Sequence, residues 1–480
     1  MTFPWHPMSV ELWLAVVLLI LFWHDLTAPP TTSSEKPQMA VLAMVGLLPV
    51  FPLCLTHLER SGAFFSGMYL LDPLARAAKA FFALTAILVI LMTREFSRHV
   101  ARGVGELYLL IMTATFGMMM LASAGDFLML FIALEIITLS FYVMTAYLRT
   151  DAKSVEAGMK YLILGALSTG FLLYGISFIY GYTGSTNFAA LREVIARSPT
   201  LPPWLLFGFL LIFAGVGFKV AAVPFHWWVP DVYEGAPTPV TAFLSVGSKA
   251  AGFVVLLRLF LSIFEPVSGV WMGLLAAVAG VTILYGNLVA MAQTNVKRLL
   301  AYSSIGHAGY LLIGIAAASG LGASAVVYYL AGYLFTNLAA FLVVIAVFNA
   351  TGSDELTAYA GLSKRAPVLA AAMFLALLSL AGMPPLAGFV GKFLLLMAAV
   401  HRGLFWLAIV GGAAVVISLY YYLLVVKRMF VDPPADATPI PVTLPVRLGL
   451  YGCMAGILLL GIWQQPFLAL AVASVRSLFS

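Results

Sequence analysis

The sequence predicts an all-α polytopic membrane protein with about fourteen transmembrane helices. Its composition is the first observation: of 480 residues, 63% are hydrophobic and 9% are charged, whereas a soluble domain carries about 25% charged residues. The second observation is that the apolar residues form continuous runs of about 20 residues, the length that crosses a bilayer. Continuous runs exclude a β-barrel, whose strands alternate apolar and polar positions.

Fourteen apolar runs follow one another, and no soluble domain separates them. Their approximate ranges are 10–28, 39–58, 70–93, 104–123, 126–148, 158–180, 203–223, 237–263, 269–291, 299–318, 321–349, 366–400, 404–430 and 446–472.

The basic residues indicate an orientation, because cytoplasmic connections are rich in Lys and Arg. With the N-terminus outside, the inner connections hold Lys36, Arg94, Arg98, Arg102, Arg149, Lys153, Lys160, Lys297, Arg298, Lys364, Arg365, Lys427, Arg428 and Arg447, and the outer side holds Arg60, Arg76, Lys79, Arg192, Arg197, Arg258, Arg402 and Arg476. The net charge of +6 therefore indicates orientation in a bacterial inner membrane and not binding to nucleic acid.

Four ionisable residues are predicted to lie at depth within the spans: Glu135, Lys219, Lys249 and Lys392. Each charge near the bilayer centre costs roughly 2.5–3.5 kcal/mol on insertion scales, so the set needs a function. Lysine suits a proton relay, because burial lowers its pKa and a nearby carboxylate raises it. A structural Glu–Lys pair, or lysines that reach toward the interface, is the alternative, although Lys249 lies too deep to reach it.

Glycine and proline surround two of these lysines. Gly215, Gly217 and Pro224 flank Lys219, and Lys392 follows a segment containing Gly382, Pro384, Pro385, Gly388 and Gly391. We therefore predict that helices seven and twelve are broken, because irregular backbone at membrane depth is tolerated where it is buried or lines a wet cavity. Matching broken helices are typical of transporters, and plain proline kinks are the alternative.

The spacing of the ionisable residues predicts two repeats. Glu135 and Lys219 are 84 residues apart, and His307 and Lys392 are 85 apart. Two five-helix blocks would account for this, and the second must be inverted because five is odd. The predicted division is 1–103 (helices 1–3), 104–263 (helices 4–8), 264–430 (helices 9–13) and 431–480 (helix 14). His307 then takes the place of Glu135 and can join the relay, unless it serves only helix packing.

A smaller polar group, His226, Asp231 and Glu234, lies between spans seven and eight on the predicted inner side. These residues either cap and bond the connection or serve proton uptake or a coupling contact.

Several segments carry a resemblance to a known family. The segments PFHWWVPDVYEGAPTPVTAFLSVGSKAAGF (224–253), NVKRLLAYSSIGHAGYLLIG (295–314), FTNLAAF (335–341) and GMPPLAGFVGKF (382–393) resemble the antiporter-like subunits of NADH:quinone oxidoreductase (complex I), which are related to Mrp-type cation/proton antiporters. VYEGAP (232–237) is similar to the N-type subunit. The resemblance implies a proton-translocating subunit whose key residues are Glu135, Lys219, Lys249 and Lys392.

The same resemblance implies that redox chemistry takes place in partner subunits. Flavin and iron–sulfur clusters are expected there, beside M-type and small membrane subunits, and no cofactor or metal is expected in this chain. Cys54 and Cys453 are too few for an iron–sulfur cluster, and no dinucleotide-binding fingerprint is present. A subunit of a Mrp-type secondary antiporter, a subunit of a ferredoxin-driven relative and an inert membrane scaffold are the alternatives.

Overall fold

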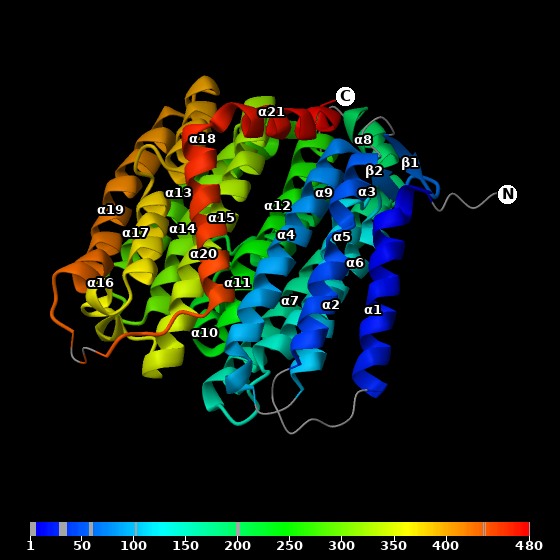
Figure 1. Ribbon diagram of the computed structural model, residues 1–480. Coiled ribbons are helices and arrows are strands. Elements are labelled where there is room, and N and C mark those ends of the chain that lie inside the picture. Colours follow the sequence, from blue (N-terminus) through cyan, green and yellow to red (C-terminus); the bar gives the residue numbers. More distant parts are fainter. Residues whose placement is uncertain are drawn as a thin grey trace.

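The computed structural model describes residues 6–27, 36–56, 61–100, 103–197, 202–434, 436 and 438–479. Within them, thirteen helices are long and apolar enough to cross a membrane. The long helices run side by side through one bundle (Figure 1), as the composition predicts. The short helices α10 and α16 lie at one end of this bundle, and α8 and α21 lie at the other.

The bounds of the elements follow the predicted spans closely at most positions. The first part contains α1 (Ser9–Thr27), α2 (Pro37–Leu47), α3 (Val50–Thr56), β1 (Gly62–Phe64), β2 (Tyr69–Leu71), α4 (Pro73–Phe96), α5 (Val104–Ala122), α6 (Phe127–Thr145), α7 (Ala152–Thr183), α8 (Phe188–Ala196), α9 (Pro203–Val220), α10 (Trp228–Gly235), α11 (Thr238–Phe243), the π-helical η3 (Leu244–Ser248), α12 (Lys249–Arg258) and the π-helical η4 (Leu259–Ile263). The second part contains α13 (Ser268–Ala290), α14 (Val296–Ala316), α15 (Gly320–Thr351), α16 (Leu362–Arg365), α17 (Pro367–Ala381), α18 (Ala387–His401), α19 (Phe405–Phe430), α20 (Leu444–Ile462) and α21 (Gln464–Val475). Short 3-10 turns are η1 (His6–Met8), η2 (Ser97–His99), η5 (Glu265–Val267), η6 (Leu356–Tyr359) and η7 (Arg476–Leu478).

Side-chain caps explain where many of these helices begin. A short polar side chain before the first turn accepts a hydrogen bond from a free backbone N–H group. Asp72, Asp126, Asp151, Asn187, Asn295 and Ser319 cap α4, α6, α7, α8, α14 and α15 in this way.

Both predicted helix breaks are present. Helix α9 ends at Val220, where Ala221 adopts a left-handed conformation, two residues after Lys219. The predicted span 366–400 is divided into α17 and α18, with Gly382 in the left-handed region between them. The two lysines lie on different sides of their breaks: Lys219 precedes Ala221 by two residues, whereas Lys392 follows Gly382 by ten residues.

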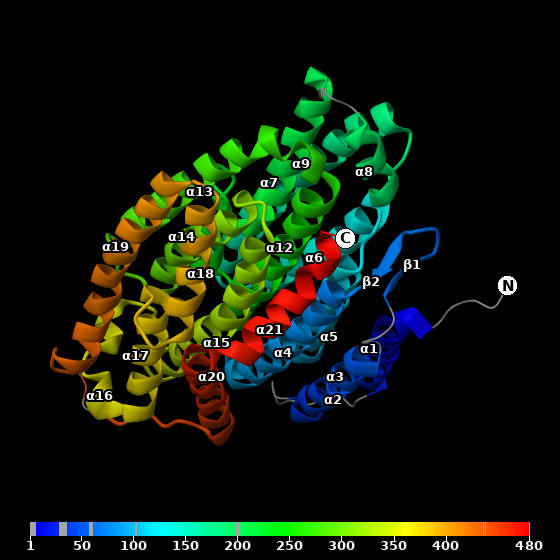
Figure 2. The same ribbon diagram turned by 90° about the horizontal axis from the view of Figure 1, so that it is seen from above.

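The C-terminal span is shorter than predicted. Helix α20 ends at Ile462, and α21 turns away to lie across the ends of α4 and α15 (Figures 1 and 2). Pro466 stands in the first turn of α21, where its missing N–H is harmless, whereas a continuous helix would lose a hydrogen bond there. The prediction of one helix over 446–472 was therefore wrong at its C-terminal end.

Two corners of the fold share the same backbone pattern about 168 residues apart. Thr186 follows the 32-residue helix α7, and its carbonyl accepts a hydrogen bond from the N–H of Phe127, the first residue of α6, at 3.0 Å. After the 32-residue helix α15, the N–H of Val296 bonds to the carbonyl of Asp354 at 2.8 Å. The bridges Asp126–Asn187 and Asn295–Glu355 complete the two corners. We name them the Thr186 corner and the Asp354 corner.

This shared register bears on the predicted repeats. The corners match at a shift of 168–169 residues, which aligns His307 with Thr138, one turn beyond Glu135. The residue that corresponds to His307 is thus Thr138 and not Glu135 as predicted, although Thr138 and Glu135 share one helix face. The corners lie at opposite ends of the bundle, next to α8 and on the side of α16 (Figure 1); the inversion of the whole five-helix block stays a prediction.

Candidate functional site

The three lysines predicted from the spans are all buried. Lys219 on α9 is 7% exposed, and Lys249 on α12 and Lys392 on α18 are each 2% exposed. Within the described part of the chain, none of the three has a carboxylate oxygen within 4.0 Å of its amine, so the alternative of a structural Glu–Lys pair has no contact to rest on. Each amine instead meets neutral oxygens, which leaves its charge open to change.

Lys219 donates a hydrogen bond to the hydroxyl of Thr138 on α6. Thr138 follows Glu135 by three residues and therefore lies on the same helix face. Glu135 itself is half-buried and accepts a hydrogen bond from the Thr169 hydroxyl at 2.9 Å. A direct ion pair between Glu135 and Lys219 is absent, although their charges interact electrostatically; their functional coupling stays a prediction.

Lys249 stands where a π-helical turn, η3, passes into α12. Such turns often mark functional positions. Its amine donates to the hydroxyl and to the carbonyl of Ser304 on α14. The Ser304 hydroxyl also lies 3.3 Å from the hydroxyl of Tyr233 on α10. Because a hydroxyl both donates and accepts, Ser304 can pass a proton where a carbonyl cannot.

Helices α9 and α12 approach closely between the first two lysines. A Cβ atom built on Gly252 would lie 2.7 Å from the Val220 side chain and 3.4 Å from the Cβ of Lys219. Glycine at 252 therefore permits this approach. Lys249 precedes Gly252 by one turn, which brings it to the neighbourhood of Lys219.

His307 is buried between tyrosines. Its Nδ1 atom contacts the Tyr329 hydroxyl, and its Nε2 atom lies 3.2 Å from the Tyr422 hydroxyl, which also contacts Ser303. The Tyr333 ring packs against both His307 and Lys249, with distances of 5.3 Å between ring centroids and 5.8 Å from the amine. His307 is thus part of the same polar core as Lys249.

Lys392 lies in α18, and its side chain reaches back to the end of α17. Its amine donates to the carbonyls of Leu380 and Ala381 at 2.8 and 3.2 Å, and it sits 4.7 Å from the centre of the Tyr310 ring. Tyr310 also packs against His307, with 6.4 Å between the ring centroids. The order along the core is therefore Lys219, Lys249, His307 and Lys392, with hydroxyls and tyrosine rings between them.

The sequence interpretation missed these connecting residues. They are Thr138, Tyr233, Ser303, Ser304, Tyr310, Tyr329, Tyr333 and Tyr422. A helical signal was available for some of them, since Thr138 follows Glu135 by three residues and Ser303 and Ser304 precede His307 by four and three. Tyr310 follows His307 by three residues on α14, whereas Tyr233, Tyr329, Tyr333 and Tyr422 come from other helices, and nothing local links these four to the site.

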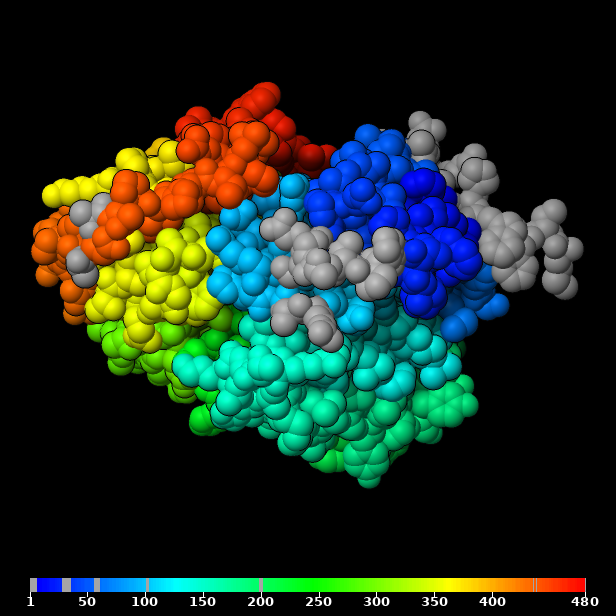
Figure 3. Space-filling view, turned by 60° about the horizontal axis from the view of Figure 1, so that its bottom comes forward, coloured from blue at the N-terminus to red at the C-terminus, as the bar shows by residue number. Residues whose placement is uncertain are grey.

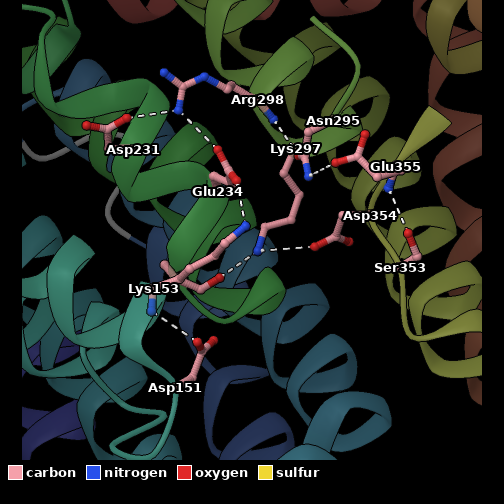
Figure 4. Close-up of polar contacts among 11 residues, drawn as sticks. Asp151, Lys153, Asp231, Glu234, Asn295, Lys297, Arg298, Ser353, Asp354 and Glu355 are labelled. Atoms are coloured by element: carbon pink, nitrogen blue, oxygen red, sulfur yellow. Dashed lines mark hydrogen bonds and ion pairs between the residues drawn. The ribbon is translucent and has the colours of Figure 1, made fainter.

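The polar group between spans seven and eight divides into two environments. Asp231 accepts from Lys160 at 2.6 Å. Figure 4 shows that Asp231 also accepts from Arg298, at 2.9 Å, and that Glu234 accepts from Lys153 and Arg298 at 3.0 Å each. Burial alone would raise the pKa of both carboxyls, but these hydrogen bonds outweigh it and hold each pKa below its usual value. Both carboxylates are ionised and tie α10 to α7 and α14.

His226 stands apart from those carboxylates. It is buried, and its ring packs on Trp227 and Tyr285, with centroid distances of 5.0 and 4.3 Å. Neither ring nitrogen has a side-chain hydrogen-bond partner among the described residues. Burial lowers its pKa, so the ring is neutral at pH 7.

Two further ion pairs show that two basic residues assigned to the outer side are buried inside the protein. Lys79, which we assigned to an outer connection, pairs with Glu11 at 2.7 Å in full burial. Arg258, assigned likewise, binds Asp72 through two nitrogens at 2.8 and 2.9 Å and donates to the Ala122 carbonyl. In each case a carboxylate that is distant in sequence makes the burial of the charge tolerable; the side of the membrane assigned to these residues stays a prediction.

The comparisons with known proteins agree with this architecture. Residues 124–418 match a family model described as the transmembrane part of NADH:quinone oxidoreductase and Mrp antiporters. NADH-quinone oxidoreductase subunit N of Moorella thermoacetica is 43% identical over 475 residues, covering 99% of each chain. Subunit N of Rhodospirillum rubrum is 42% identical over 427 residues, covering 89% of this chain and 88% of that one.

Solved structures extend the likeness to the fold. A chain of respiratory complex I from Thermus thermophilus is 32% identical with a TM-score of 0.81, over 96% of this chain and 99% of that one. A chain of the Mrp complex from a Dietzia species is 21% identical with a TM-score of 0.89, over 100% and 98%, and shows likeness of fold alone. Within the described residues, no group of His, Cys, Asp or Glu is arranged to hold a metal ion. The chain belongs to the family of NADH:quinone oxidoreductase and Mrp antiporter membrane subunits, as a relative of subunit N.

Proposed function

We propose that this chain is the N-type subunit of the membrane arm of a bacterial NADH:quinone oxidoreductase and carries protons across the inner membrane. The observation that carries the proposal is the row of buried lysines, each held by hydroxyl or carbonyl oxygens and none paired with a carboxylate. A lysine without a fixed counter-charge can gain and lose a proton, whereas a tightly paired one cannot easily do so. Relatives named subunit N along the whole chain support the assignment to this complex.

In the proposed relay, Glu135 sets the charge state of Lys219 on the facing helix. Lys219 passes its proton through water to Lys249, and Ser304 connects Lys249 to α14. His307 and its tyrosine partners lead from there to Lys392 and to the outer face. The chain supplies only this proton path, and the redox groups that drive it belong to partner subunits.

The decisive experiment is Lys219→Arg in the assembled complex. Guanidinium has a reference pKa about three units above that of lysine, so its deprotonation costs about 4 kcal/mol more and is roughly a thousandfold rarer. We expect NADH-driven acidification of membrane vesicles to be lost, while assembly, checked by subunit composition, is retained. The exposed Lys427→Arg exchange is the matched control, and full proton translocation by assembled Lys219→Arg complex would rule out Lys219 as a carrier.

The same preparation separates the alternatives. Co-purification of flavin and iron–sulfur subunits supports the NADH:quinone oxidoreductase. Their absence, together with cation/proton exchange in vesicles, would favour a Mrp-type antiporter subunit. Loss of translocation with assembly intact excludes an inert scaffold.

A further inference from the structure

A polar cavity opens at the Asp354 corner, at the end of the bundle where α10 lies. Its volume is about 300 Å3, and its wall comes from four separate connections of the chain. Figure 3 shows this end, where the cyan start of α7 and the yellow segment after α15 share one face. The charged side chains that line the cavity are Asp151, Lys153, Glu234, Lys297, Asp354 and Glu355. A volume of this size holds several waters.

A buried lysine, Lys297, and a partly buried carboxylate, Asp354, form one wall of this cavity. Lys297 is 4% exposed, and its amine donates to the Ala236 carbonyl at 2.8 Å and lies 3.8 Å from an Asp354 oxygen (Figure 4). The other carboxylate oxygen of Asp354, Oδ1, is buried and receives no hydrogen bond from the described residues. A buried polar oxygen without a partner is costly, so it marks the position of a proton or a water.

The Thr186 corner shows that this chemistry is not needed to build the backbone. There, Thr186 occupies the position of Asp354, and Leu128 occupies the position of Lys297. The Thr186 hydroxyl donates to Asp126 at 2.7 Å, which satisfies that carboxylate. The same backbone frame therefore forms with a neutral side chain and an apolar one. The ionisable pair of the Asp354 corner is therefore not required for this backbone frame.

Helix α14 leads from this corner to the buried lysines. Lys297 lies in its first turn, and Ser304, which binds Lys249, lies seven residues later on the same face. Seven residues span about 10 Å along a helix. The Ala236 carbonyl that holds Lys297 follows Tyr233 by three residues, and Tyr233 also reaches Ser304.

We propose that the cavity at the Asp354 corner is a proton-uptake site, in which Asp354 accepts a proton from water and Lys297 guides it toward Ser304 and Lys249. In this step a hydronium ion of the cavity gives its proton to the Asp354 carboxylate and leaves as water. The inference rests on the proposed function and adds to it the place where protons enter the second half of the chain.

The surroundings of Asp354 favour its protonated form more than water favours that of an exposed carboxyl group. Burial raises the pKa of its carboxyl, and Glu234 and Glu355 act in the same direction, while Lys297 and Lys153 oppose them. The net pKa lies above the usual value. As pH rises through that pKa, the fraction of protonated Asp354 falls, so uptake that depends on it must fall as well.

The test uses the assembled complex in membrane vesicles. The substitutions introduce the residue types found at the corresponding positions of the Thr186 corner, Thr186 and Leu128. We expect Asp354→Thr and Lys297→Leu to assemble, and each to lower proton translocation per NADH oxidised at least threefold. Asp354→Glu should retain the wild-type fall of uptake with rising pH, and Asp354→Thr should flatten it, a change that a purely structural role would not produce. Asp126 in the Thr186 corner corresponds to Asn295 in the Asp354 corner. The matched control is therefore Asp126→Asn, which should leave translocation unchanged.

The results separate this inference from the proposed function. If Lys219→Arg abolishes translocation while assembled Asp354→Thr pumps fully with a wild-type pH profile, the uptake site is wrong and the relay stands. If Lys219→Arg also pumps fully, the proposed function itself fails. Should Asp354→Thr not assemble, Asp354→Asn preserves the shape of the side chain, and full pumping by that variant overturns the inference equally.

Discussion

Replacing Lys79 with Met while Glu11 remains should destabilise the protein strongly. The two side chains lie 2.7 Å apart with only 1% and 2% of their surfaces exposed, and they join α4 to α1. At that distance two unit charges attract by about 6 kcal/mol at an effective dielectric constant of 20. Removing one partner strands the other charge in the interior, and such changes cost about 3–5 kcal/mol.

Removing both charges should behave quite differently. A Glu11→Leu/Lys79→Met double substitution leaves no stranded charge, so its stability should be close to that of the wild type or above it. If each single substitution costs about 3–5 kcal/mol and the double one about zero, the double-mutant cycle should give a coupling of about 6–10 kcal/mol.

Thermal melting of the detergent-solubilised protein, followed by loss of the monodisperse peak in size-exclusion chromatography, measures these changes. An unfolding entropy of about 2 cal/mol/K per residue means that each single substitution should lower the midpoint by about 3–5 °C. The exposed Lys427→Met exchange serves as control. A double variant as unstable as the single ones would show that the side chains stabilise by packing and that their pairing contributes little.

Two further substitutions probe individual members of the site. Glu135→Gln keeps an oxygen for the Thr169 hydroxyl but removes the charge, so vesicle acidification should fall severalfold with assembly intact; unchanged acidification would mean that Glu135 does not control Lys219. His226→Phe should keep proton translocation at pH 7, because the buried ring is held by Trp227 and Tyr285 and its nitrogens bind no side chain; a drop of more than half in assembled complex would assign His226 to proton uptake.

Hydrophobic runs predicted the helices well because the bilayer imposes their length, and the helices broken near Lys219 and Lys392 followed from glycine and proline. The failures have a different cause. Lys79 and Arg258 lie within apolar runs, and the sequence did not reveal that Glu11 and Asp72 pair with them in the interior of the protein. Pairing over such separations depends on tertiary packing, which no local pattern encodes.

In the candidate site, too, the sequence predicted some residues and missed those that depend on tertiary packing. Lys219, Lys249 and Lys392 could be predicted because an isolated charge in an apolar run is conspicuous. The hydroxyl groups that accept hydrogen bonds from these lysines could not be predicted, because polar residues such as serine and threonine are common in membrane helices. The Asp354 corner escaped notice for another reason: Lys297 borders a loop, and only the fold buries it.

The contact of Lys392 with the broken helix has a consequence for the integrity of that break. The carbonyls of Leu380 and Ala381 end α17 at a depth where an unsatisfied oxygen is costly, and both accept from the Lys392 amine. An ammonium group has three N–H bonds, and a neutral amine keeps two, one for each carbonyl. Lys392 can therefore release a proton without leaving either carbonyl bare, so the helix end stays capped in both states of charge.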